Sequence, residues 1–134
     1  MAETIKFELV SPSAKLASTE AVSVTVPAAE GDLTAMPRHA PFLSALRPGV
    51  IVVTGEGGES RYVVTAGFVE VTPAEVGVVA EDAAEAASVT GDWMATRIEA
   101  AEKALGEMGE GDERRTAAAQ HVADLTTLKG VLGV

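Results

Sequence analysis

The feature that most constrains this chain is a change in hydrophobic period near residue 80. Before it, the segment TIKFELV places Ile5, Phe7 and Leu9 on one face of an extended chain. The strand-like runs AVSVTV, GVIVV, RYVVT, GFVEVT and VGVVA follow, separated by turn-forming stretches such as TGEGGES and the turn at Pro73. Short strands at this close spacing predict an antiparallel β-sandwich or barrel, not alternating βα units.

After residue 80 the pattern becomes helical. The segment EDAAEAASVTG is interpreted as a linker or a frayed helical turn, and Asp92 is predicted to cap a helix from Trp93 to about Met108. GEGD then breaks the pattern, and Asp112 is predicted to cap a second helix. The apolar stripe of this second helix consists of Ala118, Val122, Leu125 and Leu128. The expected fold class is α+β, with an antiparallel β-sandwich in residues 1–85, then a linker and an antiparallel helical hairpin in residues 86–134.

Composition and charge exclude several classes of function. The chain has 134 residues and a formal net charge of −10, which opposes binding to nucleic-acid phosphates and adsorption on anionic lipid. It has no cysteine, which excludes disulfides, thiolate zinc sites and a cysteine nucleophile. No apolar run reaches the ~18–20 residues of a membrane span, and MAETIKFELV is acidic where a signal peptide needs a basic start. We therefore expect a soluble, cytosol-facing protein that binds a protein partner or a small molecule.

Residue types that perform catalysis or bind metals are few and scattered. The two histidines, His39 and His121, lie far apart in the sequence, and neither has a second histidine at metal-ligand spacing. His121 and Asp124 are interpreted as a solvated pair on one helix face. No nucleophile elbow or phosphate-binding glycine loop occurs, and GEGGES is interpreted as a hairpin turn. We expect no catalytic residue and no metal site.

Several motifs in a fixed order resemble one family. AEGDLTAMPRHAPFLSALRPGVI is similar to a region of the F-type ATP synthase epsilon subunit that reads acidic-Gly-acidic, a short apolar strand, Pro-x-His-Ala-Pro and Leu-x-x-Leu-x-Pro-Gly-Val. FELVSPSAKLASTEAVSVTVPAAEGDL resembles the opening hairpin of that family, and YVVTAGFVEVTPAEVGVVAEDA resembles its last two sandwich strands. The motifs cover the first 85 residues or so, and beyond them only the helical hairpin is shared.

The resemblance implies a non-catalytic subunit of a central stalk. In the bacterial family, the counterpart of the mitochondrial delta subunit, the sandwich lies against the gamma subunit and the polar loops of the membrane c-ring. It rotates with them and couples proton-driven rotation to ATP synthesis, while the alpha and beta subunits are contacted transiently. The implied location is peripheral, on the cytoplasmic side of the inner membrane, with the membrane reached only through the c-ring.

The resemblance also assigns residues to the interface with the c-ring and gamma. These residues are Glu30, Gly31, Asp32, Met36, Pro37, Arg38, His39, Ala40 and Pro41. The c-ring loops of the family usually have an Arg-Gln-Pro turn, so a contact between Asp32 and that arginine is expected. His39 is interpreted as a polar interface residue in preference to a catalytic base. Arg38 replaces the glycine that the family usually has, and a side chain there restricts left-handed backbone conformations.

Two prolines and three apolar residues are expected to shape this loop. Pro37 and Pro41 fix φ and should stiffen the turn. Phe42, Leu43 and Leu46 are expected to anchor the loop to the sandwich. The stretch is therefore predicted to be a rigid docking surface.

The helical half departs from the family pattern. ATP-binding members have Ile/Leu-Asp-x-x-Arg-Ala at the start of the first helix, whereas here Asp92 and Arg97 are separated by five positions, which leaves them as weak nucleotide candidates. Residues 91–134 contain five Lys/Arg and eight Asp/Glu, a net charge of −3. Inhibitory members place basic helix residues against an acidic segment of the beta subunit. We therefore expect weak or absent inhibition of ATP hydrolysis, weak or absent ATP binding, and no cofactor.

Three functions remain open from the sequence. The first is the rotor-coupling subunit that the resemblance implies. The second is an ATP-sensing switch, in which the helical half binds ATP and inhibits ATP hydrolysis. The third is a free-standing β-sandwich that binds a small ligand or hydrolyses one.

Overall fold

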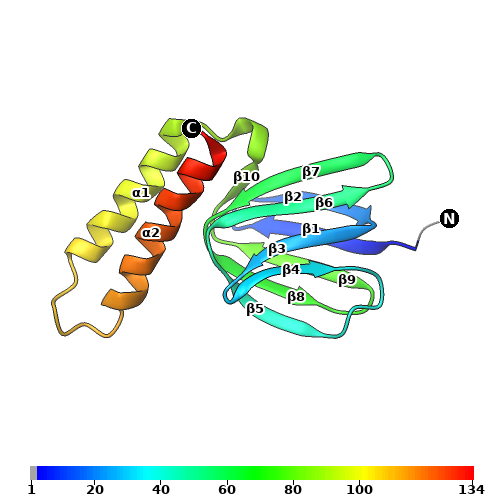
Figure 1. Cartoon of the computed structure of the whole chain (residues 1–134), viewed down its shortest axis with the longest axis horizontal. Coiled ribbons are helices and arrows are strands. Elements are labelled where there is room, and N and C mark those ends of the chain that lie inside the picture. Colours follow the sequence, from blue (N-terminus) through cyan, green and yellow to red (C-terminus); the bar gives the residue numbers. More distant parts are fainter. Residues whose placement is uncertain (1–2) are drawn as a thin grey trace. The chain divides into compact units, whose positions relative to one another are not determined.

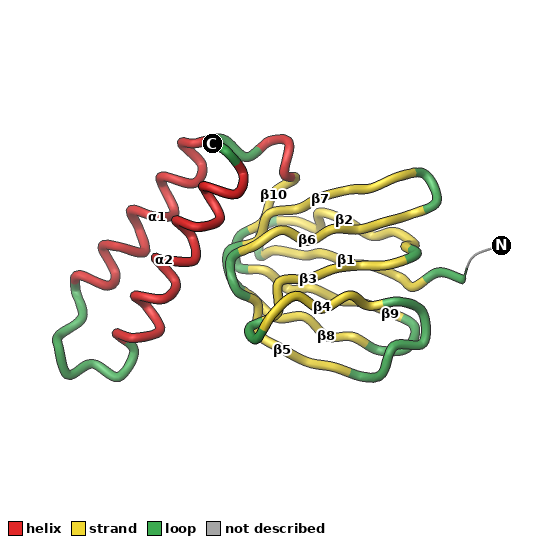
Figure 2. Tube along the Cα trace, in the orientation of Figure 1, coloured by secondary structure: helices red, strands yellow, loops and turns green. Residues whose placement is uncertain are grey.

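The computed structural model describes residues 3–134, which form two compact units. The first unit ends at Ala87 and consists of strands, and the second spans Ser88–Val134 and consists of two long helices (Figure 1; Figure 2). Ten strands make up the sheet of the first unit. They are β1 (Ile5–Ser11), β2 (Ala14–Ala21), β3 (Ser23–Ala28), β4 (Gly31–Ala35), β5 (Phe42–Leu46), β6 (Gly49–Gly55), β7 (Gly58–Val64), β8 (Gly67–Val71), β9 (Glu75–Ala80) and β10 (Ala83–Glu85).

The strands pair in the order β10-β7-β6-β3-β5-β8-β9-β1-β2, with β4 paired to β3. Every pair is antiparallel except β1 with β9, which run parallel. The N–H of Val22, just after β2, donates to the carbonyl of Thr54 in β6 at 2.7 Å. This bond draws the two sides of the sheet together into a sandwich that is nearly a closed barrel (Figure 1). The predicted sandwich is confirmed, and the parallel pair is its one exception.

Alternation along the strands builds the core of the sandwich. Ile5, Phe7 and Leu9 of β1 are fully buried, whereas Lys6 is exposed. The same alternation in the other strands buries Val24, Val26, Ile51, Val53, Val69, Val71, Val76, Val78 and Ala80. The ring of Phe7 lies 6.1 Å from that of Tyr62. Because burying each such side chain contributes ~1.5–3 kcal/mol, this layer of mostly aliphatic residues dominates the stability of the sandwich.

Four strands lie where no alternating pattern predicted them. β4 is a five-residue strand that pairs with β3. β2 is an edge strand with mostly exposed polar residues, so its hydrophobic signal is weak. β5 is short, and most of its residues lie on the surface. β10 lies in the alanine-rich segment interpreted as a linker, which is wrong for Ala83–Glu85 because these residues pair with Tyr62–Val64 of β7. Pairing between backbones, not side-chain pattern, places all four strands.

The second unit is the predicted antiparallel helical hairpin, α1 (Gly91–Gly106) and α2 (Arg115–Leu132), preceded by a short 3₁₀ turn, Ala86–Ser88. Thr90, not Asp92, caps α1, because its Oγ1 accepts the N–H of Trp93 at 3.1 Å. Met94 of α1 and the stripe residues Leu125 and Leu128 of α2 are buried. No helix within residues 3–134 is long and apolar enough to cross a membrane.

Candidate functional site

The acidic turn, which we define as Glu30–Asp32, joins β3 to β4. Asp32 forms an ion pair with Arg47, and the Arg47 Nε also donates to the carbonyl of Ala28 at 3.1 Å. Gly31 has a φ of 144°, a value that favours glycine and allows the tight turn. The predicted partner of Asp32 is an arginine of another protein, but within this chain its carboxylate is already paired with Arg47. Glu30 is exposed, and no ion pair to it is found in the described part of the chain.

The proline loop, which we define as Met36–Pro41, lies between β4 and β5. His39 closes a turn, with its N–H donating to the Met36 carbonyl at 3.1 Å and its ring Nδ1 donating to the Ala40 carbonyl at 2.7 Å. Arg38 adopts a φ of 68°, the left-handed conformation that a glycine would take easily. Its N–H donates to the carbonyl of Pro73 at 2.8 Å, and its Nη2 lies 2.7 Å from Oε2 of Glu3. These contacts fasten the loop to two other segments of the sandwich.

The acidic turn and the proline loop do not form one surface. The turn includes the start of β4 and the loop follows its end, so the three β4 residues Leu33–Ala35 separate them. At ~3.3 Å per strand residue, the distance from Asp32 to Met36 is roughly 13 Å. The predicted interface residues therefore form two patches at opposite ends of β4 (Figure 1).

An apolar strip lies on the outer face of β5, β8 and β9. We define it as Leu43, Phe68 and Val79, whose exposed fractions are 69%, 61% and 61%. Phe68 lies directly opposite Val79 in the β8–β9 pairing, and Leu43 lies on the same face of the neighbouring strand β5. These side chains line a shallow groove of about 330 Å³, which Glu8, Val10 and Glu70 also line.

One of the three predicted anchors of the proline loop, Leu43, is wrong, because it lies on the face of β5 opposite to Phe42 and Leu46. Leu46 is buried, with an exposed fraction of 7%, but Phe42 is 38% exposed and Leu43 is among the most exposed apolar residues of the strands. Leu43 pairs with Glu70, which also points away from the core. Residues adjacent along a strand point to opposite faces, so Phe42 and Leu43 could not both point into the core.

Charge around the groove is set by a local ion pair. The Nζ of Lys15 lies 3.2 Å from Oε1 of Glu8. This hydrogen bond and the Lys15 charge, together with the charge of Lys6, lower the pKa of the Glu8 carboxyl below its usual range. Glu8 therefore stays ionised at the margin of the apolar strip at physiological pH.

The helical unit contains the weak nucleotide candidates. Asp92 is exposed in the first turn of α1. The Arg97 guanidinium stacks on the Trp93 ring, 3.6 Å from its centroid, and its Nη1 donates to the Trp93 carbonyl at 3.0 Å. Arg97 is thus engaged by its own helix and is not directed toward a site shared with Asp92.

No group of three or more metal-ligating side chains is found within the residues that the structure describes. The predicted His121–Asp124 pairing is replaced by another contact, since Asp124 accepts a hydrogen bond from the side chain of Gln120 at 2.9 Å. His39 and His121 lie on different units of the fold. The described residues offer surfaces for docking and no cluster suited to bond chemistry.

Two sets of residues with notable contacts or exposure are absent from the predicted site. Phe68 and Val79 were not singled out, although the strand sequence GFVEV alternates and places Phe68 on the face opposite the buried Val69 and Val71. Arg115 was also missed, because its contacts with the end of α1 arise only when the two helices pack. An aromatic residue on the polar face of a strand is the signal that could have identified the first set.

Solved structures share the fold. A chain of the Euglena gracilis mitochondrial ATP synthase, OSCP/F1/c-ring assembly, superposes with a TM-score of 0.71 at 21% identity, covering 96% of this chain and 81% of that one. A chain from the Tetrahymena thermophila mitochondrial ATP synthase, central stalk/c-ring, gives a TM-score of 0.63 at 15% identity, with coverages of 93% and 96%.

Sequence comparison identifies the family as well as the fold. Residues 4–86 match the family model of the ATP synthase delta/epsilon chain β-sandwich domain. The chain is 42% identical to the ATP synthase epsilon chain of Mesorhizobium japonicum, covering 98% of both proteins, and 43% identical to that of Jannaschia sp., covering 97% of this chain and 98% of the relative. It is 39% identical to the epsilon chain of Paracoccus denitrificans, with coverages of 100% and 94%. The chain therefore belongs to the ATP synthase epsilon chain family, whose members are non-catalytic subunits.

Proposed function

We propose that the chain is a central-stalk subunit of a proton-translocating F-type ATP synthase, coupling rotation of the c-ring to ATP synthesis through contact with gamma. Family membership supports the complex, and the exposed apolar strip is the single observation that most supports docking. On this proposal the protein is peripheral, lies on the cytoplasmic side of the bacterial inner membrane, and reaches the membrane only through the c-ring.

The apolar strip is assigned to the gamma subunit. Contiguous exposed apolar side chains rimmed by polar ones are typical of protein interfaces, and here Leu43, Phe68 and Val79 form the centre while Glu8 and Glu70 form the rim. An aromatic residue at the centre of such a patch commonly contributes most of the binding energy. The gamma surface that covers it should therefore be apolar at its centre and basic at its margin.

The acidic turn is assigned to the polar loop of the c-ring. Asp32 is paired with Arg47, whereas Glu30 is exposed beside it, so we assign the contact with a basic c-ring side chain to Glu30. One exposed carboxylate contributes little to affinity, ~0–1 kcal/mol, but it can set orientation and the rate of association. Its removal should weaken coupling more at low ionic strength than at high, because salt screens the contribution of an exposed charge.

The helical hairpin is proposed to inhibit ATP hydrolysis weakly and to bind ATP weakly or not at all. Its net charge of −3 disfavours an acidic target, and Arg97 is stacked on Trp93 and not directed toward Asp92. Isothermal titration with millimolar ATP should therefore give no binding heat. A clear binding isotherm would instead support the ATP-sensing switch.

Co-purification tests the docking proposal. The tagged chain should elute from solubilised membranes with gamma, c and the catalytic subunits, and Phe68→Glu should lose gamma because it places a charge at the centre of the strip. The matched control is Val131→Glu, which changes an equally apolar and 74% exposed residue of α2. Elution of the unaltered chain with none of these subunits would refute the function. Equal recovery of gamma by both variants would refute only the assigned surface.

A further inference from the structure

The two helices of the hairpin end in different ways. α2 ends in a glycine cap: Gly133 has a φ of 71°, and its N–H and that of Val134 lie 3.1 and 3.4 Å from the Lys129 carbonyl. α1 has no such cap, because Glu107 follows it with a φ of −83°. Two carbonyls of its last turn, those of Lys103 and Leu105, accept the N–H groups of Glu107 and Met108 at 3.1 Å, and any further hydrogen bonds at this end must come from other donors.

Arg115, the first residue of α2, supplies such a donor from the opposite helix. Its Nη1 lies 2.8 Å from the carbonyl oxygen of Met108 and 3.4 Å from that of Leu105. The shorter contact has the geometry of a charge-assisted hydrogen bond, and the longer one adds electrostatic attraction. A cation at this position also opposes the partial negative charge at the C-terminal end of α1.

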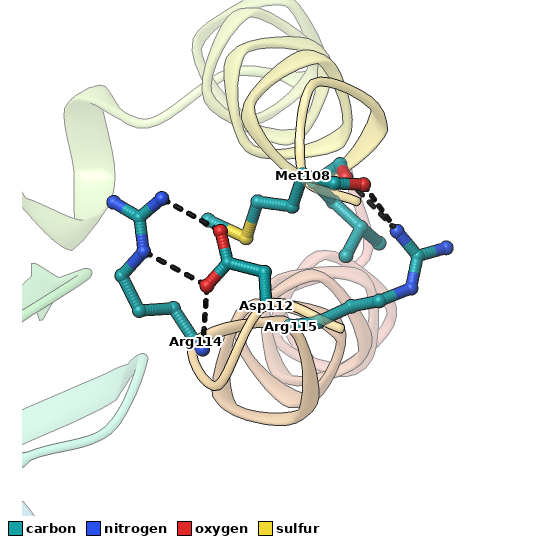
Figure 3. A network of polar contacts seen from close by, with 5 residues as sticks. Met108, Asp112, Arg114 and Arg115 are labelled. Carbon is teal, nitrogen blue, oxygen red and sulfur yellow. Dashed lines mark hydrogen bonds and ion pairs between the residues drawn. The ribbon is translucent and has the colours of Figure 1, made fainter. Parts of the chain in front are cut away.

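The connection between the helices holds Arg115 in position. The N–H of Asp112 donates to the Gly109 carbonyl at 3.0 Å, and the N–H of Arg115 donates to the Asp112 carbonyl at 3.1 Å. The Asp112 carboxylate accepts the backbone N–H of Arg114 at 2.9 Å and also binds its guanidinium. Figure 3 shows the two arginines on opposite sides of the Asp112 backbone, with Arg114 directed to Asp112 and Arg115 directed to the end of α1.

We propose that Arg115 is a latch that keeps the helical hairpin closed. Separation of α1 from α2 at this end breaks the contact of Arg115 with Leu105 in the last turn of α1 and disturbs its hydrogen bond to Met108, two residues beyond α1. The Asp112–Arg114 pair, in contrast, is local to the connection and survives separation of the helices. Arg115 therefore shifts the equilibrium toward the closed hairpin, whereas Arg114 only shapes the turn. The proposal concerns the chain alone and does not depend on its docking in a complex.

Hydrogen exchange of the full-length chain tests the latch. We compare Arg115→Met with Arg114→Met, which removes the same charge one residue away, and monitor the amides of the last turn of α1. Loss of a half-buried charge-assisted hydrogen bond should speed their exchange roughly tenfold in Arg115→Met. Arg114→Met should stay within about twofold of the unaltered chain. The amides of β8, in the other unit, give an internal reference for a folded protein.

A distance measurement gives the second readout. The chain has no cysteine, so spin labels can be placed at Ala100→Cys and Ala119→Cys, two exposed positions on α1 and α2. The distribution of distances between the labels should gain a longer component in Arg115→Met only. Exchange and distances unchanged in Arg115→Met would overturn the proposal. Equal changes in both arginine variants would also overturn it, because net charge and not the latch would then control opening.

Discussion

Gly67 is the position at which a single added methyl group should be most damaging to the sandwich. This residue begins β8, pairs with Leu46 on one side and Ala80 on the other, and has a φ of 147°. A Cβ placed here would lie 2.8 Å from the Cα of Ala80 and still closer to the carbonyl oxygen of Val79. Both neighbours are backbone atoms of β9, so no side-chain rotation can relieve the overlap.

The expected cost of Gly67→Ala follows from two contributions. An L-residue at this φ costs ~1–3 kcal/mol in backbone strain. Displacing β9 in a packed sheet costs a further ~1–3 kcal/mol. We expect the free energy of unfolding of the sandwich to fall by about 3 kcal/mol or more, which is a large part of the total for a small domain.

Urea unfolding followed by the circular dichroism of the strands measures this change. The control is Gly77→Ala in β9, because a Cβ at that position meets no atom within 4 Å and its φ lies outside the left-handed range. The control should be neutral or stabilising by ~0.4–1 kcal/mol, since alanine lowers the entropy of the unfolded chain. A difference of less than about 1 kcal/mol between the free energies of unfolding of the two variants would contradict the close approach of β8 to β9 at Gly67.

Two further predictions concern the proline loop and the helical connection. Arg38→Gly should change the free energy of unfolding by less than ~1 kcal/mol, because relief of the left-handed strain offsets the loss of the exposed ion pair with Glu3 and the greater freedom of the unfolded chain. Arg38→Val should lower the free energy of unfolding in the same urea assay. Equal stability of the two variants would contradict the left-handed backbone at this position. Arg114 lowers the pKa of Asp112 to about 2, from an ordinary value of 3.8, through a hydrogen bond to the carboxylate. The stabilisation from this lowered pKa is complete above about pH 4 and is lost as the pH falls toward 2. The helicity of Asp112→Asn should thus depend less on pH over that interval, and an unchanged acid transition would contradict the pairing.

Part of the candidate site could be predicted from the sequence, and part could not. The motif around Met36–Pro41 predicts a docking loop, which stays a prediction. Arg38 replaces a family glycine and is expected to restrict left-handed conformations, yet it adopts a φ of 68°. The pairing of Asp32 with Arg47 could not be predicted. The two residues are separated by fifteen positions. Asp32 lies in β4 and Arg47 follows β5, and they come together because both strands pair with β3.

The sequence by itself determined the two kinds of structure and their order. Alternation in β1 predicts that Ile5, Phe7 and Leu9 share one face, and spacing of three and four predicts the stripe of α2 around Leu125. These are local properties, because the geometry of a strand or helix fixes which side chains point together. The helix boundaries shifted by a few residues where a capping side chain, Thr90, competed with the predicted one.

Only the tertiary structure decided which faces are covered and which remain exposed. Leu43 and Leu46 are equally apolar in sequence, but Leu46 packs into the core opposite Gly67 while Leu43 lies on the outer face. Likewise Arg114 and Arg115 are neighbours with the same charge, but only Arg115 reaches the end of the other helix. Burial and pairing depend on segments distant in the chain, so local periodicity can group residues on a face but cannot say what that face will meet.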